Sequence, residues 1–141
     1  MLSVAELRNE HDLLLVLADE LEAVSVGDPP FDLTPIFVRL SRFAQLLQIH
    51  LLREDSLLYP ALIASGDRRL AAVAATFQDE LGDLDILVEA YEQKWTGSAI
   101  SYRWADFCED TGTLLRRVRT RIHREDEGLY PLLEGLTELA A

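Results

Sequence analysis

The chain has 141 residues, of which 49% are hydrophobic, so it can form one domain with one core and is too apolar to be a disordered chain. Its 25 acidic and 13 basic side chains give a formal charge of −12, which argues against binding to nucleic acid or to an anionic membrane surface. The single cysteine, Cys108, cannot form an internal disulfide, and neither a signal peptide nor a membrane-spanning run is visible. We expect a single domain over residues 1–141 of a soluble cytoplasmic protein.

Apolar residues recur at steps of three and four along the chain, which predicts helices and no strands. Start and stop signals divide the sequence into four expected helices, over residues 3–26, 34–64, 67–95 and 98–130. Ser3 and Glu6 form a capping box for the first helix, and Asp67 caps the third. Thr34 is the expected N-cap of the second helix with Pro35 at its first helical position, and Pro60 should kink or break that helix. Short connections between four such helices predict an all-α, up-down-up-down four-helix bundle.

Ionisable side chains interrupt the apolar stripe that each of these helices should bury. They are His11 on the first helix, His50 and Glu54 on the second, Glu80 on the third and Glu125 on the fourth. In a bundle of alternating direction all five lie at a similar depth, so one end of the bundle should collect them. Several buried carboxylates need a positive partner, and carboxylate with imidazole suits iron, manganese or zinc. We therefore predict a metal site with these five residues as ligands.

Three segments of the sequence resemble the signatures of one family. Residues 50–60 contain His-x-x-x-Glu followed by Tyr-Pro, and residues 121–131 end in the same way, with Glu125 and then Tyr130-Pro131. Together with Asn9-Glu10-His11-Asp12, these blocks resemble the hemerythrin-like (HHE cation-binding) domain family over nearly the whole chain. The resemblance implies a four-helix bundle with a non-haem di-iron site of histidines and two bridging carboxylates, which binds oxygen or related small ligands.

The sequence departs from this family pattern in two places. The third helix lacks the expected histidine, since residues 77–80 are Phe-Gln-Asp-Glu, and Arg121 stands where the fourth helix should carry one. With three histidines in the chain, a five-histidine oxygen carrier is excluded. Two interpretations remain: either Glu80 and Glu125 replace the missing histidines, or Arg121 neutralises Glu125 and the site holds no metal. Tyr59 and Tyr130 are interpreted as packing groups at the helix breaks.

The leading functional hypothesis is an iron-binding protein with two non-haem ions per chain, for which manganese or zinc are alternatives. Such a centre would bind or react with O2, NO or peroxide, in sensing, detoxification or iron handling. The alternative is a metal-free bundle that acts as a signalling or adaptor module, whose acidic surface would select a basic protein partner. An oxidase or peroxidase ranks third, because the sequence shows no substrate pocket.

Overall fold

The computed structural model describes residues 2–135, and it contains no strand within that range. Its helices are α1 (Val4–Val24), α2 (Thr34–Arg53), the π-helical segment η1 (Glu54–Leu58), α3 (Tyr59–Ile63), α4 (Arg68–Leu81), α5 (Leu84–Lys94), α6 (Ala99–Tyr102), α7 (Trp104–Gly128) and α8 (Tyr130–Glu134). None of the described helices has the length and apolarity needed to cross a membrane.

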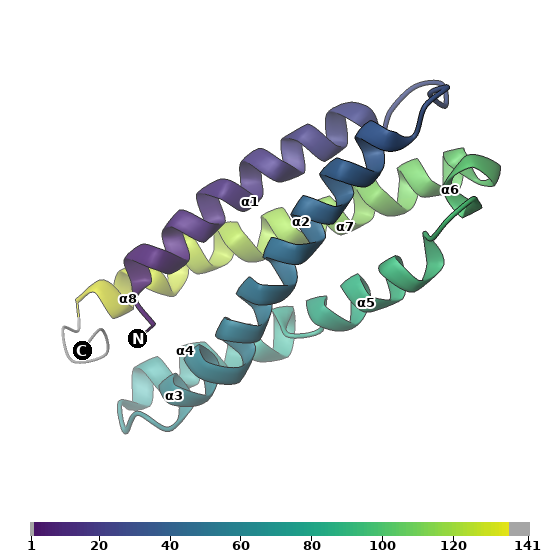
Figure 1. Cartoon of the computed structure of the whole chain (residues 1–141). Coiled ribbons are helices and arrows are strands. Elements are labelled where there is room, and N and C mark those ends of the chain that lie inside the picture. Colours follow the sequence, from purple (N-terminus) through teal and green to yellow (C-terminus); the bar gives the residue numbers. More distant parts are fainter. Residues whose placement is uncertain (1, 136–141) are drawn as a thin grey trace.

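These helices form four rods that run up, down, up and down (Figure 1). α1 is the first rod, α2 continues through η1 into α3, α4 and α5 together form the third, and α7 is the fourth. α1 packs against α2 and α7, and α5 packs against the same two helices, which closes the ring of neighbours that defines a four-helix bundle. The predicted all-α bundle is therefore confirmed.

Side-chain caps start two of the rods as the sequence predicts. The Ser3 hydroxyl accepts a hydrogen bond from the Glu6 N–H at 3.1 Å, and the Asp67 carboxylate accepts one from the Leu70 N–H at 3.0 Å. The start of α2 differs from the prediction, because Thr34 is already helical and its N–H donates to the Asp32 carboxylate at 3.0 Å.

The second rod changes register at η1 instead of breaking at Pro60. The Tyr59 N–H bonds to the Glu54 carbonyl, five residues back, so the π-helical segment adds one residue to the turn. Within this segment Leu58 is buried and Leu57 is 58% exposed, whereas a regular step of three from Glu54 would bury Leu57. Pro60 lies in the first turn of α3 and the rod continues past it.

A layer of ionisable side chains separates two apolar cores. On α1, Leu7 belongs to the core at the α3–α8 end of the bundle and Leu14 to the core at the α6 end, with His11 between them. Glu54 on the second rod and Glu125 on α7 lie between the same two cores, and all three polar side chains are fully buried. The packing of the four rods therefore places these groups inside the bundle, away from water.

The register change at η1 predicts that truncating two neighbouring leucines lowers stability by very different amounts. Leu58→Ala should lower the free energy of unfolding by about 2–4 kcal/mol, because it leaves a cavity in the core, whereas Leu57→Ala should change it by less than about 0.5 kcal/mol. Urea unfolding of the two variants checks this. Equal losses, or a larger loss for Leu57→Ala, would show that the helix keeps α-helical register through residue 58.

Candidate metal centre

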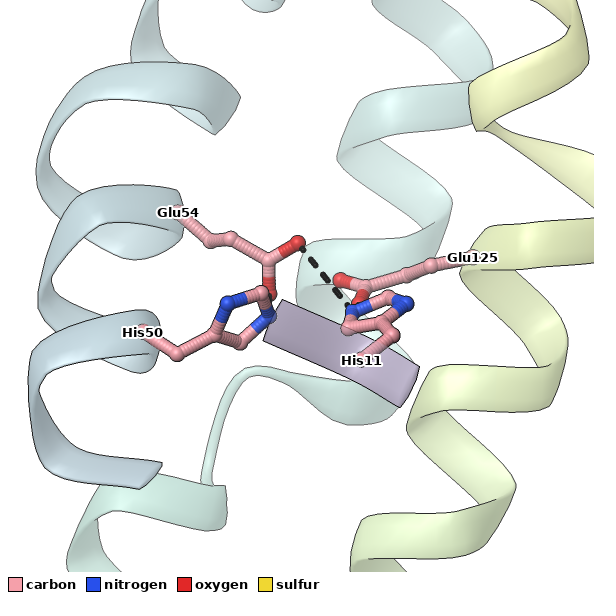
Figure 2. A group of neighbouring side chains, drawn as sticks. All are labelled: His11, His50, Glu54 and Glu125. Carbon is pink, nitrogen blue, oxygen red and sulfur yellow. Dashed lines mark ion pairs between the residues drawn. The ribbon is translucent and has the colours of Figure 1, made fainter. Parts of the chain in front are cut away.

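Four of the five predicted ligands meet in the buried layer. His11 comes from α1, His50 from α2, Glu54 from the start of η1 and Glu125 from α7, and each side chain is at most 2% exposed. Figure 2 shows the four side chains converging from three rods. One ligand atom of each residue lies within 4.8 Å of the others, so the group could hold a metal ion.

Two further carboxylates orient the histidines from outside this cluster. The Nδ1 atom of His11 lies 2.8 Å from the Asp126 carboxylate, and the Nδ1 atom of His50 lies 2.6 Å from Glu10. With Nδ1 occupied in this way, the Nε2 atom of each ring faces the centre of the cluster. Metal-ligating histidines usually have such an outer partner, which fixes the tautomer and the direction of the ring.

Arg121 lies beside the cluster with its side chain 3% exposed. Its guanidinium donates to Glu125 Oε2 at 3.1 Å, to Glu54 Oε1 at 3.2 Å and to Asp55 Oδ1 at 2.7 Å. The predicted pairing of Arg121 with Glu125 is therefore present, but the same side chain also holds Glu54. The contact with Asp55 could not be seen in the sequence, because it depends on the register of η1.

The two tyrosines that precede the prolines belong to the site and are more than packing groups. The Tyr59 hydroxyl donates to Glu125 Oε2 at 2.7 Å, and the Tyr130 hydroxyl donates to Glu54 Oε2. Tyr59 follows Glu54 in residues 50–60, and Tyr130 follows Glu125 in residues 121–131, each by five residues. Each hydroxyl nevertheless bonds the glutamate of the other segment. That shared spacing was the available sequence signal, and the crossed pairing needs the tertiary structure.

Glu80 does not join the cluster, so the prediction that it faces inward is wrong. Its side chain is 49% exposed and pairs with Arg124 at 2.6 Å. The buried residues of α4 are Leu70, Ala74 and Phe77. From Phe77 a step of three reaches Glu80 and a step of four reaches Leu81. The helix takes the step of four, so Leu81 packs against the core and Glu80 faces outward. The third histidine of the chain, His123 on α7, is exposed.

Two buried atoms of the cluster have no hydrogen-bond partner among the described residues, namely His50 Nε2 and Glu125 Oε1. His50 Nε2 lies 3.0 Å from Glu54 Oε1, and Glu125 Oε1 lies 3.2 Å from His11 Nε2, but neither pair has the alignment of a hydrogen bond. Buried polar atoms are rarely left without a partner. An imidazole nitrogen and a carboxylate oxygen of this kind fit a cation that binds both, so these donors suit the metal that the family resemblance implies.

Charge in the layer shifts the pKa of each member. Burial lowers the pKa of His11 and His50, but the adjacent carboxylates outweigh this and raise both above the ordinary value. Burial raises the pKa of Glu54, but His50 and Arg121 outweigh it and bring the pKa to about 2. Burial and the charge of Glu54 raise the pKa of Glu125. Without metal, the imidazoles therefore supply positive charge to the carboxylates.

A small cavity of about 10 Å³ adjoins these groups. It is bordered by His50, Glu54, Arg121 and Glu125 on one side and by apolar residues of four helices on the other: Leu14, Leu47, Leu51, Leu84, Val118 and Ile122. This volume is about the space that one water molecule needs.

The histidine pKa values predict how the stability of the metal-free protein depends on pH. A histidine with a raised pKa stabilises the fold fully below pH about 6.5, the unfolded value, and this contribution disappears as the pH rises through the folded value. The free energy of unfolding, measured with urea and a chelator, should therefore fall from pH 6 to pH 9.

The double variant His11→Gln, His50→Gln should show a flatter pH profile, whereas His123→Gln, at an exposed position, should keep the wild-type slope. An unchanged slope in the double variant would contradict the proposed charge state of the layer.

A comparison with known protein families gives a match that includes the clustered residues. A family model described as the hemerythrin HHE cation binding domain matches residues 2–133, a range that includes all four clustered ligands. Neither the curated proteins nor the solved structures gave a match. The match covers nearly the whole chain and confirms the resemblance seen in the sequence. The chain belongs to the hemerythrin HHE cation-binding domain family.

Proposed function

We propose that this protein binds non-haem iron at His11, His50, Glu54 and Glu125, and that it functions through the contact of that iron with O2, NO or peroxide. One observation carries this proposal: four buried nitrogen and oxygen ligands converge, and two of them, His50 Nε2 and Glu125 Oε1, have no hydrogen-bond partner among the described residues. The family match supports binding of a cation.

The donor set supports iron as that cation. Two imidazoles with one or two carboxylates and an open position are typical of non-haem Fe(II) sites, although manganese or zinc can use the same ligands. Iron, when bound, supplies the redox exchange with O2, NO or peroxide that zinc lacks. The outer carboxylates Asp126 and Glu10 hold both imidazoles in the orientation that such binding needs.

The surroundings of the cluster favour a small ligand. The adjacent cavity of about 10 Å³ has room for a water-sized molecule and excludes an organic substrate. On its polar side, the N–H groups of Arg121 are hydrogen-bond donors near the ligand atoms of Glu54 and Glu125. A buried pocket of this kind suits sensing, detoxification of small oxidants or iron handling.

A second candidate function is a metal-free signalling or adaptor module, and Arg121 is the observation that favours it. This guanidinium already neutralises part of the charge of Glu54 and Glu125, which is the task that a cation would otherwise perform. The net charge of −12 would then favour a basic protein as the partner.

Metal uptake distinguishes the two candidates. Purified metal-free protein, titrated with Fe(II) under anaerobic conditions, should bind iron tightly enough to retain it through desalting. His50→Gln and Glu54→Gln each remove one ligand and should lose this retention, whereas Glu80→Gln, on the surface of α4, should match the wild type. A wild-type protein that takes up no iron, manganese or zinc would leave the metal-free module as the function.

The outer carboxylates give a second prediction. Asp126→Asn and Glu10→Gln keep all four ligands but weaken the acceptor that orients each imidazole, so each should lower metal affinity by about 10–100-fold. Competition with a chelator of known affinity measures the change. Asp12→Asn, at an exposed position of α1, is the control and should leave affinity unchanged. Affinities equal to wild type in both outer variants would contradict an orienting role.

A further inference from the structure

Residues 50–60 and 121–131 share a sequence pattern, and Arg121 occupies in the later segment the position that His50 occupies in the earlier one. His50 precedes Glu54 by four residues, and Arg121 precedes Glu125 by the same interval. The distances are similar as well, since His50 Nε2 lies 3.0 Å from Glu54 and Arg121 Nε lies 3.1 Å from Glu125, although only the Arg121 contact is a hydrogen bond. The guanidinium therefore stands where a second imidazole ligand would face the shared carboxylates.

The third rod supplies a hydrogen-bond acceptor for Arg121 at this depth. α4 ends at Leu81, and the Leu81 carbonyl accepts a hydrogen bond from Arg121 Nη1 at 3.3 Å. The last carbonyls of a helix have no partner within the helix, so the break between α4 and α5 leaves this oxygen free to bind the guanidinium. The buried residues on either side of the break, Phe77 and Leu84, are apolar, and no described α4 or α5 side chain joins the ligand cluster.

Arginine is suited to hold this position permanently. Its guanidinium has five N–H donors, no acceptor and a charge that is not lost in proteins. Four hydrogen bonds use these donors in the structure, and their acceptors are Glu125, Glu54, Asp55 and the Leu81 carbonyl. The side chain is thus a fixed cation that bridges the same two glutamates as the metal site.

The charge of the layer sets how many metal ions it can hold. The outer carboxylates of Asp126 and Glu10 pair with Arg8 and Arg53 and add no net charge. Glu54, Glu125 and Asp55 each contact Arg121, so three carboxylates and one guanidinium leave a net charge of minus two when the imidazoles are neutral, as metal ligands must be. One divalent cation balances this charge. A second would leave two uncompensated positive charges in a buried layer, which is strongly unfavourable.

We propose that Arg121 takes the place of a second cation, so that the centre holds one metal ion and not the two expected from the family resemblance. This inference rests on the proposed metal-binding function. The single ion is held by His11, His50, Glu54 and Glu125, and the Arg121 guanidinium neutralises the remaining carboxylate charge beside it.

Metal stoichiometry tests the inference directly. The full chain, freed of metal, is dialysed to equilibrium against excess Fe(II) under anaerobic conditions, and iron per chain is determined by elemental analysis. We expect one ion in the wild type and in Arg121→Lys, which keeps a cation at this position. Arg121→His restores the histidine–glutamate spacing and frees Asp55 as a further oxygen ligand, so its count should rise to two. Arg117→His, on the exposed side of α7, controls for adventitious binding and should stay at one.

Electron paramagnetic resonance of the oxidised samples gives an independent readout. An isolated ferric ion gives a high-spin signal, whereas two bridged ferric ions couple and lose it, so the wild type should show the signal and Arg121→His should not. Circular dichroism checks that each variant is folded. If Arg121→His does not fold, the wild-type count and its spectrum decide the question.

The outcomes separate this inference from the proposed function. Two ions in the wild type would overturn the inference while the metal-binding function stands. No ion in the wild type would overturn both. One ion in a folded Arg121→His would show that Arg121 is not the residue that excludes the second cation.

Discussion

The structure depends on how the bundle compensates two buried carboxylates, Glu54 and Glu125, in the layer between its apolar cores. Both are fully buried, and each would be strongly destabilising without positive partners and hydrogen bonds. Every group around them serves that need, whether it is an imidazole, a tyrosine hydroxyl or the Arg121 guanidinium. A divalent cation would be a further partner of the same kind, so metal binding would use the same contacts as structural stabilisation.

Residues 50–60 and 121–131 each supply a tyrosine hydroxyl to the glutamate of the other segment. Tyr59 from the first block bonds Glu125, and Tyr130 from the second bonds Glu54, so neither glutamate is satisfied by its own rod alone. The π-helical segment that begins at Glu54 allows this, because its extra residue brings Tyr59 inward. Such segments are frequent at functional sites, where they redirect a side chain that regular helix geometry would turn away.

Arg121 makes the site asymmetric. His50, in residues 50–60, faces the glutamates with an imidazole that can be a metal ligand. Arg121, in residues 121–131, faces them with a permanent cation that has no lone pair for a metal. The layer is therefore partly neutralised before any metal binds, and His11 and His50 supply the remaining positive charge when protonated. A metal bound by these imidazoles would displace those protons, so its affinity would depend on pH.

The sequence alone predicted the four helical rods and four buried polar positions, because helical periodicity is local. These positions are His11, His50, Glu54 and Glu125. It misplaced Glu80, since a step of three or of four from Phe77 is equally regular and only the step of four, to Leu81, is the one the helix takes. Only the tertiary structure decided which atoms meet across the bundle. The hydroxyl of Tyr59 and its acceptor lie 66 residues apart, and a periodic pattern specifies which face of a helix is buried but not its partner on another helix.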